Sequence, residues 1–182
     1  MKIKWMAVAA TLIALSGCEA DPELNSNTEL EPTFTGELTV DPTSWGSLSA
    51  LDDEAYTIEE MLVYALQDEY SARTEYITIM DTYDITKPFS NIKASEDNHI
   101  ALLLPLFETY GLEVIEDESL DHLHEIESLE EAYEIGVVAE INNIAMYNAF
   151  LTQELPDDLI DAFTKLRDAS ENHLAAFEKH AS

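Results

Sequence analysis

The sequence predicts an all-α fold, a four-helix bundle in which two antiparallel helix hairpins are joined by a long crossover. In four segments the apolar residues recur at spacings of three and four, which is the period of one helix face. Helix start and stop signals bound these segments. Two of the three connections are short, but about 16 residues separate Gly111 from Ser128. A connection of that length can run the full height of a bundle.

The first hairpin is expected to contain helices over residues 57–83 and 91–110. Thr57 is followed three residues later by Glu60, which is the spacing of a capping box. Gly111 is a suitable residue to end the second helix, because glycine adopts the left-handed conformation that often follows a helix.

The second hairpin follows the crossover. Ser128 and Glu131 have capping-box spacing again, and this helix is expected to reach about residue 152. Pro156 is expected in the first turn of the fourth helix, where its missing N–H costs nothing. Within the crossover, "DHLHEI" (121–126) is predicted to form a short helical turn.

The N-terminus resembles the signal peptide of bacterial lipoproteins. Lys2 and Lys4 precede a short apolar stretch that ends in "LSGC", residues 15–18. The resemblance implies a signal peptide over residues 1–17 and lipid on Cys18. It also implies an exported, membrane-anchored protein on the periplasmic or cell-surface side, with the membrane itself left open. The alternative is an ordinary signal peptide in which the cysteine has no role.

Cys18 is the single cysteine of the chain, so a disulfide is excluded and a lipidated Cys18 leaves no thiol ligand. Residues 18–50 are acidic and rich in Pro, Ser, Thr and Asn, which predicts a disordered tether after the lipidated cysteine. Residues 51–182 have the length of one small domain.

The net charge is −30, from 38 acidic and 8 basic side chains. Such a surface excludes nucleic acid as a partner and disfavours anionic lipid surfaces, so the predicted contact with a bilayer is through the lipid on Cys18. Cations are favoured near the surface. The sequence does not identify a protein partner.

Each predicted helix carries charged or imidazole side chains in the middle of its apolar face. Other acids, such as Glu75 and Asp97, are expected to point outward. An unpaired buried carboxylate costs several kcal/mol, so the core residues need compensation. Carboxylates and imidazoles on facing helices are the ligand set of two-metal bundles. The sequence therefore predicts a metal site formed by Glu69, Glu96, His99, Glu140 and His173.

Iron is the expected metal, as one ion or two, and Mn, Zn and Cu also suit these ligands. The alternative is a buried network without metal, in which Arg73 neutralises the carboxylates. Tyr76, Tyr110 and Tyr147 lie at neighbouring positions of the apolar faces. They are expected to fill the core, or else to hydrogen-bond the ligands or carry an electron. His122, His124 and His180 are weaker candidates for exterior ligands.

The phrases "ASEDNH" (94–99) and "ASENH" (169–173) differ by one residue, and that residue matters. Glu171 and His173 are two positions apart, so on a helix they point in different directions. Aligned from the histidine, Ser170 takes the place of Glu96. The second phrase therefore offers one ligand where the first offers two, which leaves the number of metals open.

Four phrases of the chain resemble the ferritin-like superfamily, and within it a bacterial family catalogued as domain of unknown function 2202. They are "EYSARTEY" (69–76), "FSNIKASEDNHIALLLPLFETYGL" (89–112), "AEINNI" (139–144) and "LRDASENHLAAF" (166–177). The resemblance implies a four-helix fold with a metal-binding core, and it implies no reaction. The chain departs from the superfamily's second Glu-x-x-His pattern at Ser170.

Three functions are compatible with these residues. The first is redox chemistry, in which iron reacts with oxygen or peroxide and the protein is an enzyme. The second is a module that sequesters or senses metal without turnover. The third is a structural or interaction bundle that has lost its metal, for which Ser170 is the main argument. The sequence does not decide whether the protein is an enzyme.

Overall fold

The structure, a computed structural model, describes residues 45–123 and 125–181. Within these residues the prediction of an all-α fold is confirmed. The helices are α1 (Gly46–Asp52), α2 (Ile58–Tyr83), α3 (Phe89–Thr109), the 3₁₀ turn η1 (Ser119–His122), α4 (Leu129–Phe150) and α5 (Asp157–Phe177). The four long helices lie within about two residues of their predicted starts and ends, and η1 begins two residues before the predicted turn.

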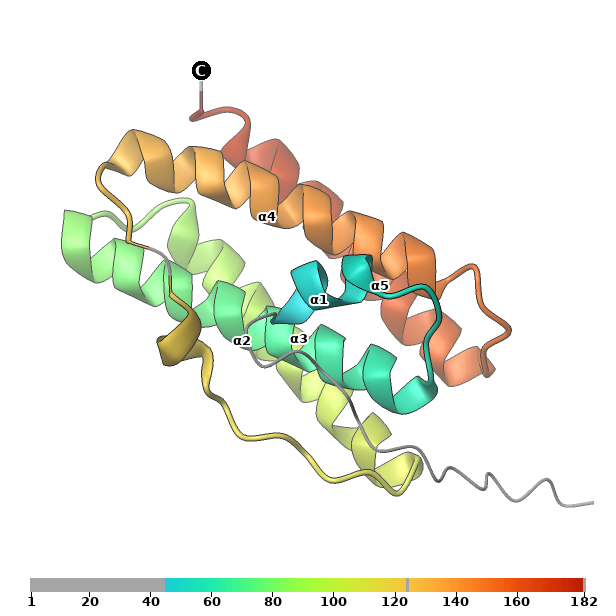
Figure 1. Cartoon of the computed structure of the whole chain (residues 1–182). Helices are drawn as coiled ribbons and strands as arrows, with labels where there is room; N and C mark the ends of the chain where they lie inside the picture. Colours follow the sequence, from blue (N-terminus) through green and yellow to red (C-terminus); the bar gives the residue numbers. More distant parts are fainter. Residues whose placement is uncertain (1–44, 124, 182) are drawn as a thin grey trace, which may run out of the picture. The chain divides into compact units, whose positions relative to one another are not determined.

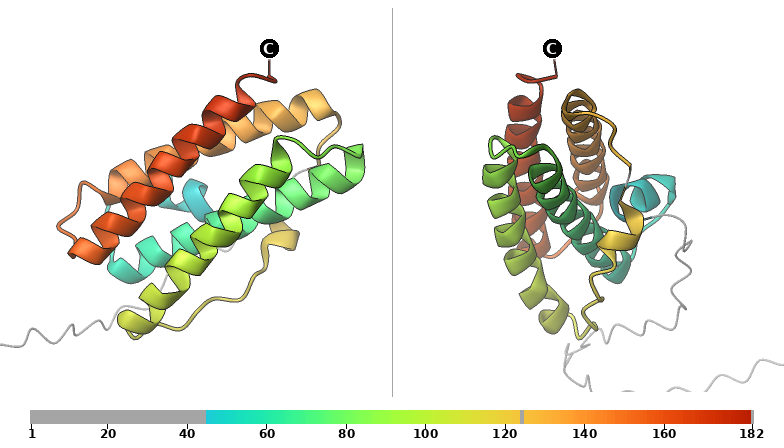
Figure 2. Two further views of the ribbon diagram at one scale, coloured as in Figure 1. Left: turned by 180° about the vertical axis from the view of Figure 1, so that it is seen from behind. Right: turned by 90° about the vertical axis from the view of Figure 1, so that its left-hand side faces the viewer.

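The long helices form two hairpins that pack against each other. α2 packs along α3 and α4 along α5, while α2 also contacts α4 and α3 contacts α5 (Figures 1 and 2). The segment between α3 and α4, which includes η1, runs along the outside of the helices (Figure 1). Each long helix therefore has two long neighbours and turns one face to a shared interior.

The helix ends follow the predicted chemistry with two differences. Pro156 precedes α5 as its N-cap residue and does not lie in its first turn. Thr57 and Glu60 make both bonds of a capping box. Ser128 accepts a hydrogen bond from the Glu131 N–H, but the Glu131 carboxylate accepts from the N–H of Glu127, so the second box is incomplete. Gly111 has φ +67°, and the N–H groups of residues 111 and 112 bond back to Glu108 and Phe107, which closes α3.

Ordered structure begins earlier than the predicted domain boundary at residue 51. α1 packs on α2 and α4 and has four buried residues, so residues 46–50 are not part of a disordered tether. The Gly46 N–H donates to the side chain of Gln67, and the Ser47 N–H donates to Asp68. Gly46 has φ +58°, and a Cβ there would lie 2.8 Å from Asp68 Oδ1. The boundary was missed because this short segment has no helical periodicity.

The apolar core is divided into two clusters along the bundle. One is built around Leu66, Phe107 and Phe150, and the other around Phe89 and Phe177. On α3, α4 and α5 the buried polar residues lie between the residues of the two clusters, and on α2 Glu69 lies between Leu66 of the first cluster and Tyr76 of the second. The bundle interior is thus apolar at both ends and polar in its middle.

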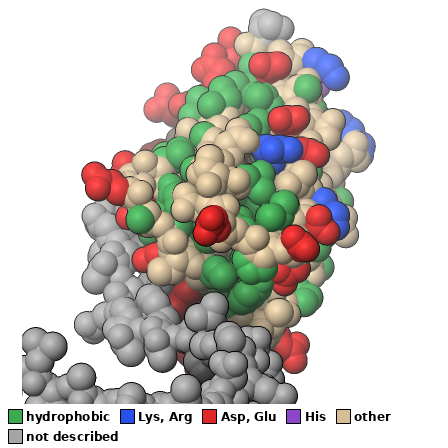
Figure 3. Space-filling model, turned by 90° about the vertical axis from the view of Figure 1, so that its right-hand side faces the viewer, with side chains coloured by type: hydrophobic (Ala, Val, Ile, Leu, Met, Phe, Trp, Pro, Cys, Tyr) green, Lys and Arg blue, Asp and Glu red, His purple; other side chains and the backbone are tan. Residues whose placement is uncertain are grey.

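The surface is acidic, and acidic side chains outnumber basic ones on the face drawn in Figure 3. Of the helices that the structure describes, none combines the length and apolarity needed to cross a bilayer. The predicted signal peptide, the lipidated Cys18 and most of the predicted tether lie outside the described residues, as does His124.

Candidate metal centre

All five residues predicted to bind metal lie together in the polar middle of the bundle. Glu69, Glu96 and Glu140 are 1–3% exposed, and His99 and His173 are each 8% exposed. α2 and α4 each contribute one glutamate, α3 contributes a Glu-x-x-His pair, and α5 contributes one histidine. The apolar clusters above and below keep these side chains away from bulk water.

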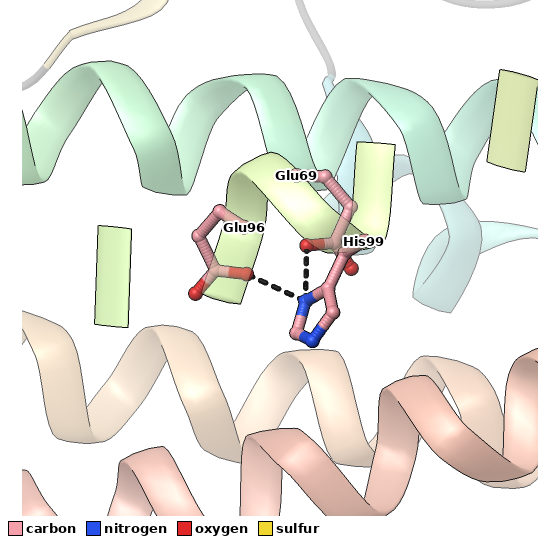
Figure 4. Close-up of side chains that lie close together, drawn as sticks. All are labelled: Glu69, Glu96 and His99. Atoms are coloured by element: carbon pink, nitrogen blue, oxygen red, sulfur yellow. Dashed lines mark hydrogen bonds and ion pairs between the residues drawn. The ribbon is translucent and has the colours of Figure 1, made fainter. Parts of the chain in front are cut away.

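The first group consists of Glu69, Glu96 and His99. His99 Nδ1 lies 2.9 Å from Glu69 Oε2 and 2.7 Å from Glu96 Oε2. Figure 4 shows both carboxylates directed at the same ring nitrogen. On its other side the ring meets Ser95, with 3.0 Å between His99 Nε2 and the serine Oγ. When Nε2–H donates to Ser95, Nδ1 is the nitrogen left to bind a metal.

The second group consists of Glu96, Glu140 and His173. His173 Nδ1 lies 3.2 Å from Glu96 Oε1 and 3.4 Å from Glu140 Oε1. Glu96 therefore belongs to both groups and offers one oxygen to each histidine. The two imidazole rings are nearly parallel, with centroids 5.7 Å apart. This arrangement places two similar three-ligand groups on either side of one shared carboxylate.

Two tyrosines donate hydrogen bonds to Glu69 and Glu140, which are called the outer glutamates here because each belongs to one of the two groups. The Tyr147 hydroxyl donates to Glu69 Oε1 at 2.7 Å, and the Tyr76 hydroxyl donates to Glu140 Oε1 at 3.0 Å. Both tyrosines are almost fully buried. Burial raises the pKa of each phenol well above its usual value, and the nearby carboxylates add to the effect. Both phenols therefore remain protonated and act as donors that orient the carboxylates.

In the absence of metal the histidines carry the compensating charge. Burial by itself lowers the pKa of both imidazoles, but hydrogen bonds to the carboxylates outweigh it. They raise the pKa of His99 to about 10 and that of His173 to about 9. Burial tends to raise the pKa of Glu96, yet its bonds to the two histidines hold it below the usual value. For Glu69 burial prevails, and its pKa is raised.

The other predicted neighbours of the site lie in different places. Arg73 pairs with Asp117 at the surface and lies over the Tyr70 ring, so it does not neutralise the core carboxylates. The Tyr110 hydroxyl donates to Asp158 and takes no part in the centre. Ser170 is buried, and its hydroxyl donates to the Leu166 carbonyl one turn earlier. Ser170 therefore leaves Glu96 as the single shared carboxylate.

The exterior histidines make aromatic contacts. His122 stacks on Trp45, and His180 stacks on Tyr133. Neither residue belongs to a group of three potential ligands among the described residues.

Sequence reasoning missed a second layer of acids beside the centre. Asp68 accepts hydrogen bonds from the Ser47 N–H and from Asn143 Nδ2. Burial raises the pKa of Asp68 to about 7, with a contribution from the charges of Glu69 and Glu140. Glu75, expected on the outside, is partly buried, and burial together with the charges of Asp68 and Glu140 raises its pKa to about 7. These acids lie toward α1, whose presence the sequence pattern did not reveal.

The residues present fit a metal ion. In each group the ligand atoms lie within 4.8 Å of one another. A metal with ligand bonds of about 2.0–2.2 Å separates its ligand atoms by distances in this range. The donor set is carboxylate and imidazole, which suits iron, manganese and zinc. Each metal would take the place of the proton that a histidine now shares with two carboxylates.

Fold and site together define an all-helical protein with a buried Glu/His cluster that could hold a metal ion. Residues 58–181 match the family described as an uncharacterized protein domain, DUF2202, and the chain belongs to that family.

A solved structure has a similar fold, the crystal structure of hypothetical protein MJ0754 from Methanococcus jannaschii DSM 2661. It is 22% identical, with 71% of this chain and 83% of that chain covered at a TM-score of 0.59. No curated protein matches this chain.

Proposed function

We propose that this protein is a ferritin-like metal protein whose bundle core would hold two divalent iron ions, with Glu96 as the ligand available to both. The observation that carries the proposal is the shared position of Glu96, whose two oxygens face two different histidines. Two hairpins joined by a long outer crossover are the connectivity of ferritin-like bundles, and such bundles hold metals with these residue types.

The ligand roles follow from the geometry. Glu69 and His99 would hold one ion together with one oxygen of Glu96, and Glu140 and His173 would hold the other with the second oxygen. Tyr147 and Tyr76 hold the outer carboxylates in place. Removal of such supporting hydrogen bonds typically weakens metal binding by about 10–100-fold.

The charge of the site also fits two ions. Two divalent ions with three carboxylates leave one positive charge uncompensated. Asp68 and Glu75 supply negative charge near the centre, since their pKa values respond to the charges of the ligand glutamates. They raise the affinity of the site for cations without occupying a position among the five ligands.

A carboxylate-rich pair of iron sites supports the handling of oxidants. Two ferrous ions would supply one electron each to hydrogen peroxide, which together with two protons gives two water molecules. The protein's own groups bind and orient the ligands, and the apolar clusters at both ends exclude water. The phenols of Tyr76 and Tyr147 donate to the two outer carboxylates and leave the shared Glu96 to the histidines.

The setting of this activity is part of the proposal. The lipid on Cys18 would anchor the protein to a bacterial membrane after export, with residues 19–44 as the acidic linker to the helical domain. The anchored protein would then encounter oxidants and ferrous ions outside the cytoplasm. An exported chain with an unmodified Cys18 and no label after growth on labelled palmitate would contradict the anchor.

Anaerobic loading followed by oxidation tests the function. The metal-free full chain is titrated with Fe(II), and peroxide or oxygen is then admitted while near-ultraviolet absorbance and peroxide consumption are followed. Two bound ions that are oxidised with the consumption of one peroxide per pair, repeatedly when excess Fe(II) is supplied as the reductant, support the proposal. Two bound ions without turnover indicate metal storage or sensing, and an absence of bound metal leaves a structural bundle.

A further inference from the structure

The outer side of α4 is apolar, although the protein as a whole is strongly acidic. Over residues 135–153 the single charged residue is Glu140, and it is buried at the metal centre. Val138 and Ile141, on the outer side, are 57% and 50% exposed. In the neighbouring α5, by contrast, each of the first four turns carries an exposed charged residue. A helix with apolar residues all round it is normally covered on every side.

The outer residues of α4 have the spacing of a helix–helix contact. They follow one another at intervals of four, three, four and three residues, and they are Glu134, Val138, Ile141, Ala145 and Asn148. This alternation keeps one stripe of a helix directed at a partner helix, as in coiled coils. Ala145 is half-buried, and the other four are exposed. α4 therefore carries a second stripe in addition to the one that faces the bundle interior.

α1 extends this apolar surface on one side. It packs against α4 (Figure 1), and its outer residues Leu48 and Leu51 are 53% and 40% exposed. Leu48 and Val138 line the same hollow, which has a volume of about 620 Å³, so the exposed residues of the two helices adjoin. Contiguous exposed apolar surface of this kind marks sites of interaction. The outer stripe of α4 together with Leu48 and Leu51 is called the apolar face below.

Charge indicates which partner the apolar face fits. Because the net charge is −30, two copies of the chain repel each other across most of their surfaces. At the apolar face they can meet without bringing acids together, and depletion of charge is typical of the core of a protein interface. A basic partner would instead be attracted to the acidic remainder of the surface. A second copy offers the matching element, an uncharged helix with the same spacing.

The two ends of the stripe indicate the relative direction of the paired helices. Glu134 and Asn148 each lie seven residues from Ile141, on the N-terminal and the C-terminal side. In an antiparallel pair centred on Ile141, the Glu134 carboxylate of one copy faces the Asn148 amide of the other, which can donate to it. A parallel pair would set two Glu134 side chains against each other, and like charges so placed are costly. A two-fold axis at Ile141 satisfies both ends at once.

We propose that two copies of this chain associate through the apolar face, with the two α4 helices antiparallel and Ile141 at the two-fold axis. The proposal is independent of the metal centre. α4 has 22 residues and is about 33 Å long, so the strip that two copies share is at the lower end of specific interface sizes. The dimer should therefore form at micromolar concentrations and dissociate on dilution.

Sedimentation equilibrium of the metal-free full chain, under reducing conditions and from about 1 μM to about 1 mM, tests the proposal. The parent is expected to pass from monomer to dimer over this range. Ile141→Asp should weaken association by about 100-fold or more, because the axis places two new charges side by side in an apolar contact. Ile77→Asp is the matched control and should associate as the parent does. Ile77 is an exposed isoleucine of α2, in a hollow to which α1 and α4 contribute no described residue.

Two results would overturn the proposal. One is a monomer at every concentration, whether the apolar face is left open or is covered by residues 1–44 of the same chain. The other is association that Ile141→Asp leaves unchanged, since the contact then lies elsewhere. Ile141→Leu keeps the contact apolar and should dimerise as the parent does. Circular dichroism checks that each variant is folded, which the exposure of Ile141 leads us to expect.

Cross-linking with a short bismaleimide tests the direction of the helices. In a Cys18→Ser background, chains with Glu134→Cys are mixed with chains with Asn148→Cys. Antiparallel pairing brings the two different thiols together, whereas two copies of either variant alone hold their thiols about 21 Å apart along the helix axis. The mixture should therefore cross-link well and the separate variants poorly. Efficient cross-linking of Glu134→Cys alone would indicate parallel helices and overturn the antiparallel arrangement.

Discussion

Replacement of Glu96 by Gln should affect both halves of the metal centre, whereas replacement of Glu140 should affect one. Glu96 offers one oxygen to His99 at 2.7 Å and the other to His173 at 3.2 Å. Glu140 meets His173 alone, at 3.4 Å, and is also held by Tyr76. The two variants change charge equally and keep the side-chain shape, so their difference measures the sharing of Glu96.

The expected magnitudes follow from these contacts. In the metal-free protein, Glu96→Gln leaves two buried imidazoles without their common partner and should lower the free energy of unfolding by about 3–5 kcal/mol. Glu140→Gln removes one charged contact and should cost about 1.5–3 kcal/mol. With metal, Glu96→Gln should bind neither ion tightly, and Glu140→Gln should keep the ion at Glu69 and His99.

The assay is urea unfolding followed by circular dichroism, with and without metal, together with metal analysis of dialysed protein. Glu171→Gln, on the exposed side of α5, is the matched control and should behave as the parent. Equal losses of stability and of metal in the Glu96 and Glu140 variants would refute the sharing of Glu96.

Three further outcomes are expected. Tyr147→Phe removes a buried hydrogen bond to a ligand carboxylate and should cost about 1–3 kcal/mol and weaken metal binding, whereas Tyr110→Phe, at the surface, should leave metal binding unchanged in calorimetric titrations. The folded-state pKa values of His99 and His173 are raised to about 10 and about 9 from 6.5, so their contribution to metal-free stability is complete below pH 6.5 and is lost as pH rises through those values. Melting temperatures should therefore fall over that range without metal, and a flat profile would contradict the charged state of the histidines. Gly46→Ala strains a φ of +58° and brings a Cβ to 2.8 Å from Asp68 Oδ1, so proteolysis should begin near α1 rather than at later loops.

The sequence was sufficient for the long helices and for the five core ligands because both leave a periodic signal. A helix that turns one face to the interior repeats its apolar residues every three or four positions, and a glutamate or histidine within that repeat stands out. The structure places Glu69, Glu96, His99, Glu140 and His173 together for this reason. The serine at position 170, where the Glu-x-x-His pattern has a glutamate, was also visible in the sequence. Its hydroxyl donates to a carbonyl of its own helix.

The sequence was insufficient where a residue's environment comes from another element. From the pattern of α2 alone Glu75 is expected to point outward, but it lines a hollow of about 620 Å³ to which α1, η1 and α4 also contribute residues. Asp68 is half-buried and hydrogen-bonded because α1 and α4 supply its partners, Ser47 and Asn143. Arg73 could have turned either way on its helix, and an acid in the crossover, Asp117, binds it at the surface.

The arrangement of metal around Glu96 is the central claim, and anomalous diffraction from crystals of the iron-loaded full chain tests it most directly. Two anomalous peaks about 3.5–4 Å apart, both in contact with the Glu96 carboxylate, are the expected result. One peak should also contact Glu69 and His99, and the other Glu140 and His173. A single peak away from Glu96, or no peak in the polar middle of the bundle, would contradict the two-metal centre.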